Sequence, residues 1–144
     1  MLKTVKEVMT AHPVCVTLQD NIYEVAVKMR DADTGVIPVV DSTDRETLIG
    51  IITDRDLVIR GYAQKHSGST SVETVMTKGI TAVSESTSVD EAADLMASKQ
   101  IRRIPVVNGK KLIGIVSLGD LAVKNIFADE AADALTDISH QHLH

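Results

Sequence analysis

The feature that most constrains this fold is an internal repeat. The segment VKEVMT at residues 5–10 returns as VETVMT at residues 72–77, and PVVD at 38–41 returns as PVVN at 105–108. Both pairs are 67 positions apart. A repeat of this length predicts two copies of one structural unit, each too small to bury a large core alone. We place the copies at about residues 4–62 and 71–127 and predict that together they form one domain.

A second pair of segments marks the end of a strand in each copy. LIGIITDRDL at residues 48–57 returns as LIGIVSLGDL at residues 112–121, an offset of 64. The three missing residues fall in the turn that precedes the strand, where a change of length is tolerated. Each copy places a hydroxyl residue after the apolar run and an aspartate three positions later: Thr53 with Asp56, and Ser117 with Asp120. At a strand-to-helix turn these side chains lie together, where they either cap the helix or bind a ligand that bears hydroxyls and phosphates.

The remaining pattern predicts strand–helix–strand–strand–helix in each copy, which is an α/β (α+β) fold. Asn21 with Glu24, and Ser88 with Glu91, have the spacing of reciprocal helix caps. The helices that follow have an apolar face with helical spacing, made of Ile22, Val25, Ala26 and Met29 in one copy and Val89, Ala92, Ala93 and Met96 in the other. The predicted elements are a helical lead-in at 4–9, strands at 14–17, 36–40, 48–53, 103–107 and 112–117, and helices at 54–64 and 118–127.

Turn and breaker residues refine this assignment. Pro38 and Pro105 lie inside predicted strands, which favours an edge strand or a bulge. Asn108-Gly109 predicts a hairpin turn, and the polar segment 65–71 predicts a linker. The alanine-rich tail at 129–144 could form a short helix with Ala131, Ala132, Leu135 and Ile138 on one face.

Composition excludes several function classes. Aromatic residues make up only 2% of the chain and the net charge is −5, so neither a base-stacking platform nor a large phosphate-backbone footprint is expected, and nucleic acid is an unlikely partner. A single cysteine, Cys15, cannot form an internal disulfide. The N-terminus has no signal-peptide pattern and no long apolar run follows, so we expect a cytoplasmic protein without a membrane segment. The sequence contains no Ser–His–Asp cluster and no phosphate-binding glycine loop, so we expect no enzyme activity.

The doubled strand ends and the hydrophobic-Pro-Val-Val strands resemble the cystathionine-β-synthase (CBS) domain pair, or Bateman module. The resemblance covers residues 4–127, and it is specific because the motifs occur twice and in order. The chain is also similar to the small stand-alone bacterial members of this family. The resemblance implies two CBS repeats related by a pseudo-twofold axis, spanning about 1–128, with ligand clefts between them. It further implies a disc-like homodimer and a non-catalytic sensor that acts on another, unknown protein.

The same resemblance implies which ligand and which residues are involved. The expected ligand is an adenosine nucleotide (AMP, ADP or ATP) or S-adenosylmethionine, with no required cofactor. By family position, Asp56 and Asp120 would accept hydrogen bonds from ribose hydroxyls, which suits an ionised carboxylate. Thr53 and Ser117 would reach ribose or phosphate. The other candidate binding residues are Val14, Thr34, Gly35, Ile37 and Ile51 with Arg55 in the first copy, and Thr81, Ile101, Ile104 and Ile115 in the second.

Two consecutive arginines make the predicted clefts unequal. Neighbouring strand residues point to opposite faces, so one arginine could serve each cleft. By family position, the resemblance implies that Arg103 would join Ser117 and Asp120, and that Arg102 would join Thr53 and Asp56. Guanidinium groups fit phosphate bidentately. The equivalent positions in the first copy, Gly35 and Val36, carry no charge. Gly119 also lacks the second hydroxyl that family members often have at this turn.

Two alternatives stay open. The clefts could be degenerate, leaving a structural or interaction protein whose arginines and caps have no ligand. Less favoured is a metal or redox sensor that uses Cys15 or the tail histidines His140, His142 and His144. For Cys15 the simpler expectation is a small buried apolar residue, and for the tail an interaction segment.

Overall fold

The computed structural model describes residues 3–123, which fold into two compact units. Unit 1 contains residues 3–12, 81–109 and 113–123, and unit 2 contains residues 13–80 and 110–112. Neither unit coincides with one repeat. Each combines the body of one repeat with the lead-in segment of the other.

The sheet of unit 2 has three strands in the order β2 (Val16–Thr17), β3 (Val36–Val40), β4 (Leu48–Thr53). The parallel pair β2/β3 needs a crossover, and the helix α2 (Ile22–Ala32) provides it. β3 and β4 form an antiparallel hairpin in which Val36 lies opposite Thr53. Helix α3 (Asp54–Asp56) begins directly after β4, and the helical path continues through a π turn at Leu57–Gly61 and a 3-10 turn at Tyr62–Gln64.

The sheet of unit 1 repeats this plan. Its strand order is β1 (Thr10–Ala11), β7 (Lys111–Ser117), β6 (Arg103–Asn108), β5 (Val83–Ser84). The crossover between the parallel strands β5 and β6 is α5 (Val89–Lys99), and α6 (Leu118–Val123) begins directly after β7. The predicted α/β (α+β) class and element order are confirmed.

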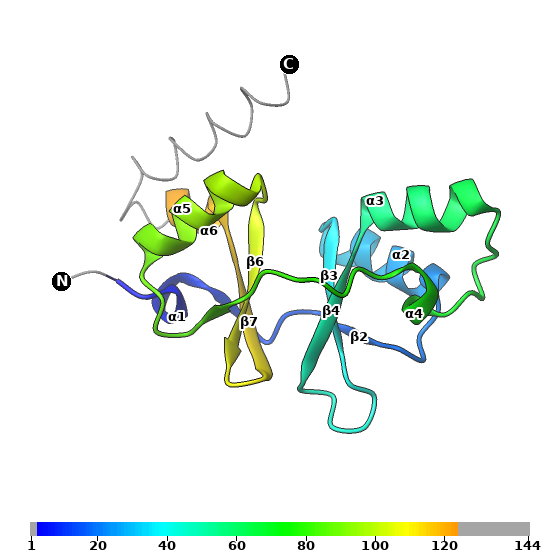
Figure 1. Ribbon diagram of the computed structural model, residues 1–144, viewed down its shortest axis with the longest axis horizontal. Coiled ribbons are helices and arrows are strands. Elements are labelled where there is room, and N and C mark those ends of the chain that lie inside the picture. Colours follow the sequence, from blue (N-terminus) through cyan, green and yellow to red (C-terminus); the bar gives the residue numbers. More distant parts are fainter. Residues whose placement is uncertain (1–2, 124–144) are drawn as a thin grey trace, which may run out of the picture. The chain divides into compact units, whose positions relative to one another are not determined.

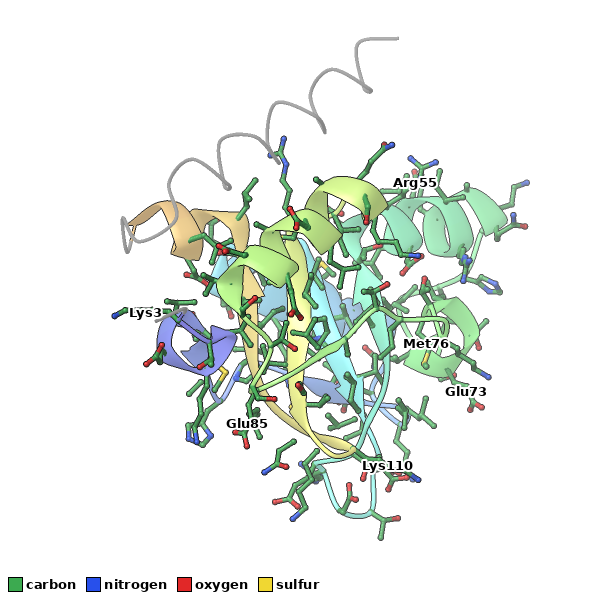
Figure 2. The ribbon with its side chains drawn as sticks, turned by 60° about the vertical axis from the view of Figure 1, so that its left-hand side comes forward. Lys3, Arg55, Glu73, Met76, Glu85 and Lys110 are labelled. Carbon is green, nitrogen blue, oxygen red and sulfur yellow. The ribbon has the colours of Figure 1, made fainter. Side chains whose placement is uncertain are left out.

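The lead-in segments complete the sheets. In unit 1, α1 (Val5–Val8) leads into β1, where Thr10 pairs with Ile115 of β7. In unit 2, α4 (Val72–Val75) leads to Thr77, which exchanges both backbone hydrogen bonds with Ile51 of β4, at 3.0 and 2.8 Å. Figure 1 shows α1 beside the β7 sheet and α4 next to α2, and Figure 2 marks Glu73 on α4 and Met76 at its end.

Each unit has its own cluster of buried apolar side chains. In unit 1 the cluster includes Val5 and Val8 of the lead-in together with Met96, and in unit 2 it includes Val72, Val75 and Met29. Both methionines therefore fill cores as predicted. Ala26 was expected on the buried face of α2 but is exposed, because the buried stripe of that helix consists of Ile22, Val25 and Met29.

Several local predictions are confirmed. The Oδ1 atom of Asn21 accepts a hydrogen bond from the Glu24 N–H at 2.9 Å, and the Ser88 hydroxyl accepts one from the Glu91 N–H at 3.1 Å. The predicted hairpin turn lies between β6 and β7, with Gly109 at φ +64°. The predicted C-terminal tail and the end of the last helix lie outside the described residues.

The edge-strand alternative for the prolines was wrong, whereas the bulge alternative agrees with a register shift of the β3/β4 pair between Val39 and Val40, next to Pro38. Pro38 lies in β3, the central strand of its sheet, and Pro105 lies in β6, which is also internal. Ile51, the residue opposite Pro38, directs its N–H and C=O to Thr77 instead, and β2 begins to pair with β3 only at Val39. Pro38 therefore occupies a position where no neighbouring strand requires a donor.

Candidate functional site

The two strand ends form matching capped turns. In unit 2, Thr53 Oγ1 accepts the Asp56 N–H at 3.0 Å, and Asp56 Oδ2 accepts the Thr53 N–H at 3.0 Å. In unit 1, the corresponding distances between Ser117 and Asp120 are 3.0 and 2.9 Å. Both pairs therefore cap the helices that follow, which is the structural role considered above. A carboxylate has about four acceptor sites, so capping alone leaves each aspartate able to accept further hydrogen bonds.

The Asp56 carboxylate is also bound on its second side. The Thr77 hydroxyl donates to it at 3.1 and 3.2 Å from the two carboxylate oxygens, and Arg60 Nε lies 3.9 Å from Oδ1. Arg60 also donates to the Met76 carbonyl at 3.0 Å. Asp56 is only 8% exposed. In this state its carboxylate holds the second lead-in segment against the first repeat.

Asp120 has a more open environment. Its side chain is half-buried, and within residues 3–123 its carboxylate accepts a hydrogen bond only from the Ser117 N–H, through Oδ2. The residue that matches Thr77 is Thr10, which is exposed. The Oδ1 atom of Asp120 thus has no partner in the described part of unit 1, so the two aspartates differ despite their matching turns.

Backbone hydrogen bonds place the arginines beside the Ser117 turn. The Leu118 N–H donates to the Arg102 carbonyl at 2.9 Å, just as the Asp54 N–H donates to the Gly35 carbonyl at 2.9 Å in the other unit. Since Val36 lies opposite Thr53 in unit 2, the same arrangement places Arg103 opposite Ser117 in unit 1. Opposite residues of an antiparallel pair point to one face, so Arg103 and Ser117 lie on the same side of the sheet.

The first-copy residue equivalent to Arg102 is Gly35, which lies beside Asp54. A Cβ added at Gly35 would lie 2.8 Å from Asp54 Oδ2, so a larger residue there would displace the exposed Asp54 side chain. At Gly119 the nearest atom to an added Cβ is Ser117 Oγ at 3.6 Å, an ordinary contact.

The other predicted binding residues have diverse environments. Ile37 and Ile104 are fully buried in the cores of units 2 and 1, so neither residue exposes surface to a ligand. Ile115 is 9% exposed. Val14, Arg55 and Arg102 are exposed, with Arg55 at the start of the helical segment after β4 (Figure 2). The half-buried residues are Thr34, which donates to the Val36 carbonyl at 3.2 Å, and Ile51, Thr81 and Ile101.

Sequence reasoning missed Thr77 and Arg60, although a signal for each was present. Thr77 follows the repeated Val-Met pair, and Arg60 lies four positions after Asp56, the spacing of a helical ion pair. Cys15, expected to be buried, is a half-buried free cysteine whose carbonyl accepts a hydrogen bond from Lys28.

Comparison with known proteins identifies the family. The family model described as the CBS domain matches residues 5–61 and 72–124. The chain belongs to the CBS domain family. Its two matches in tandem make it a CBS-domain pair, a module that is generally regulatory and non-catalytic.

The relatives agree with this assignment. The chain is 53% identical over 135 residues to the uncharacterized protein YlbB of Bacillus subtilis, covering 94% of this chain and 90% of that protein. It is 33% identical over 122 residues to hypoxic response protein 1 of Mycobacterium tuberculosis, covering 84% of each. The crystal structure of CBSX2 in complex with AMP matches with a TM-score of 0.76 and 25% identity, covering 88% of this chain and 98% of that one.

Two searches of residues 3–123 gave negative results. None of the helices there combines the length and hydrophobicity needed to cross a bilayer. That range also contains no group of three or more histidine, cysteine, aspartate or glutamate side chains arranged to hold a metal ion.

Proposed function

We propose that this CBS-domain pair is a sensor that binds an adenosine nucleotide at the Ser117–Asp120 turn of unit 1 and acts on a partner protein. The observation that carries the proposal is the contrast between the two aspartates. Asp120 is half-buried with one oxygen unpaired among the described residues, whereas Asp56 is bound by Thr77 and Arg60. The AMP complex of the similar CBSX2 supports the choice of ligand class.

The chemistry of the turn suits a nucleoside phosphate. An ionised carboxylate accepts hydrogen bonds from vicinal ribose hydroxyls, which are donors. Arg103, on the same face as Ser117, supplies a guanidinium group that pairs with phosphate oxygens. The missing hydroxyl at Gly119 removes one phosphate contact, so we expect AMP and ADP to bind at least as well as ATP.

Calorimetric titration with AMP, ADP, ATP and S-adenosylmethionine tests the proposal. We expect saturable binding of at least one, and Asp120→Asn should weaken it by about 1.5–3 kcal/mol, roughly 10- to 150-fold, since a hydrogen bond to a charged acceptor has this value. Asparagine keeps an oxygen to cap the Ser117 N–H, so the turn survives. Asp56→Asn is the matched control and should change affinity much less. No binding of all four compounds at millimolar concentration would refute the proposal.

We also propose that the chain forms a homodimer. Val58, Ile59 and Tyr62 are 56%, 48% and 84% exposed on the helical segment after β4, and this cluster of apolar side chains suits an interface between copies. Replacing Tyr62 and Ile59 with glutamate should shift the protein to monomer in sedimentation velocity. If the unmodified protein is monomeric and its sedimentation does not change on dilution, this part of the proposal is contradicted, while nucleotide binding is unaffected.

A second candidate function is favoured by the Asp56 contacts. Because Thr77 and Arg60 occupy that carboxylate, the first strand end has a structural role already. If neither turn binds nucleotide, the chain functions through its surfaces as an interaction protein. Binding of a partner that is indifferent to all four nucleotides would identify this case.

A further inference from the structure

A groove runs along the surface of unit 1, between strand β5 and helix α5. It has a volume of about 560 Å³, and the residues that line it include Ala82, Val83, Glu91, Asp94, Leu95 and Ser98. None of these residues belongs to the candidate nucleotide site. The groove combines an apolar floor with two exposed carboxylates on α5.

The corresponding region of unit 2 shows what such a groove can hold. The elements match at an offset of 67, because β2 and α2 correspond to β5 and α5 over their full lengths. There, Lys28 extends from α2 to β2 and donates from Nζ to the Cys15 carbonyl at 3.0 Å, in a partly buried position. An ammonium group of the chain itself thus occupies this place in unit 2.

Unit 1 lacks that ammonium group and has gained negative charge. Leu95 stands at the position of Lys28 and has no group to donate to the Ala82 carbonyl, which matches that of Cys15. Asp94 stands at the position of Val27.

The neighbouring Glu91 also lacks the side-chain hydrogen bond that its counterpart Glu24 has. In unit 2 the Asn21 amide donates to the Glu24 carboxylate at 3.2 Å, but Ser88 uses its hydroxyl to accept the Glu91 N–H. Among the ion pairs of residues 3–123, none involves Glu91 or Asp94.

We propose that this groove binds a lysine side chain presented by a partner protein. The ammonium group would pair with Asp94 and Glu91 and donate to the Ala82 carbonyl, and its aliphatic stem would lie on Leu95 and Val83. The external lysine would then take the position in unit 1 that the Lys28 side chain occupies in unit 2.

The openness of the groove favours a polypeptide over a free amine. Glu91 and Asp94 are exposed, and an ion pair in water contributes little by itself. A lysine carried on a chain can add contacts along the groove, whereas a small amine cannot. The inference does not depend on nucleotide binding, because the two sites share no residue.

The experiment is a titration followed by amide chemical shifts of the full chain. The probe is a trilysine peptide, with n-butylamine and an Nε-acetylated trilysine peptide as comparisons. We expect the trilysine peptide to shift the amides of Val83, Ser84, Leu95 and Ser98, and the acetylated peptide to leave them unchanged. Butylamine should bind at least tenfold more weakly than trilysine.

Two variants copy the sequence of unit 2 into the groove. Leu95→Lys installs the internal lysine and should weaken trilysine binding at least tenfold, and Asp94→Val should weaken it severalfold. Glu73→Gln removes one carboxylate outside the groove and is the charge-matched control for Asp94→Val. The proposal is overturned if the acetylated peptide binds as well as trilysine, if both variants bind trilysine as well as the unmodified protein does, or if Glu73→Gln weakens binding as much as Asp94→Val. If butylamine binds as tightly as trilysine, the assignment to a partner protein is overturned.

Discussion

At the scale of single residues, the contact of Thr77 is one feature that distinguishes the two capped turns. Thr77 donates its hydroxyl to the buried carboxylate of Asp56, whereas Thr10, at the same place in the repeat, is exposed. A buried carboxylate that loses a donor keeps the cost of its lost hydration, so its partners contribute more to stability than surface contacts do. A threonine at this place in the repeat therefore contributes more to stability in unit 2 than in unit 1.

Thr77→Val should lower the free energy of unfolding by about 1–3 kcal/mol, because it removes a hydrogen bond to a charged, buried acceptor without changing side-chain volume. Thr10→Val is the matched control, and we expect a change within about 0.5 kcal/mol. Chemical denaturation of both variants provides the measurement. Equal stability losses would show that the Thr77 hydroxyl has no special role.

At the scale of elements, the loop between β3 and β4 is ordered by one carboxylate. Asp44 accepts hydrogen bonds from the Thr47 hydroxyl and from the N–H groups of Thr47 and Glu46, the last two at 3.0 and 2.9 Å. These donors, the Thr47 hydroxyl first, lower the pKa of Asp44 from 3.8 to about 2. Since the folded form has the lower pKa, its contribution to loop order is complete above about pH 4 and is lost as the pH falls toward 2.

Replacing Thr47 with valine should raise the pKa of Asp44 back toward 3.8, because the largest stabiliser of its charged form is removed. The side-chain carboxyl carbon shift of Asp44, followed by NMR between pH 1.5 and 6, measures the change. The unsubstituted protein, measured under the same conditions, is the reference. An Asp44 midpoint that does not move in Thr47→Val would contradict the assignment.

The repeated glycine of strands β4 and β7 lets the lead-in segment approach. A Cβ at Gly50 would lie 2.8 Å from the Thr77 carbonyl and would also meet Met76, and one at Gly114 would lie 2.9 Å from the Thr10 carbonyl. The backbone partners leave no room for a methyl group. The glycine in each Leu-Ile-Gly-Ile segment is therefore required by packing between strands rather than by a turn.

Gly50→Ala should destabilise the protein by about 1–3 kcal/mol, since inserting a methyl into a tight contact forces the backbone to shift. Gly79→Ala is the control, because nothing lies within 4 Å of its added Cβ. Thermal or chemical unfolding compares the two. A Gly79→Ala variant that loses as much stability as Gly50→Ala would contradict the steric explanation.

At the scale of the whole molecule, the repeats exchange their first segments. Val5 lies in the core of unit 1 with the second repeat, and Val72 lies in the core of unit 2 with the first. Both side chains are fully buried. A substitution in one repeat should therefore loosen the body of the other.

Val5→Ala should reduce hydrogen-exchange protection in residues 83–117, and Val72→Ala should reduce it in residues 16–53. Each removes two buried methyl groups, with an expected cost of about 2 kcal/mol. Peptide-level exchange followed by mass spectrometry distinguishes the two patterns. If protection is lost only in the repeat that carries the substitution, the packing of each first segment on the other repeat is contradicted.

The sequence by itself determined the repeat, the element order and the capped strand ends, because periodicity, caps and turn residues act within a few positions along the chain. It did not determine the partners of those elements. Pro38 lies in an inner strand and Asp56 is bound by Thr77, both through contacts between segments that a local pattern does not encode. Tertiary structure decided which of two matching aspartates is open, because burial and hydrogen-bond supply depend on what packs against each turn.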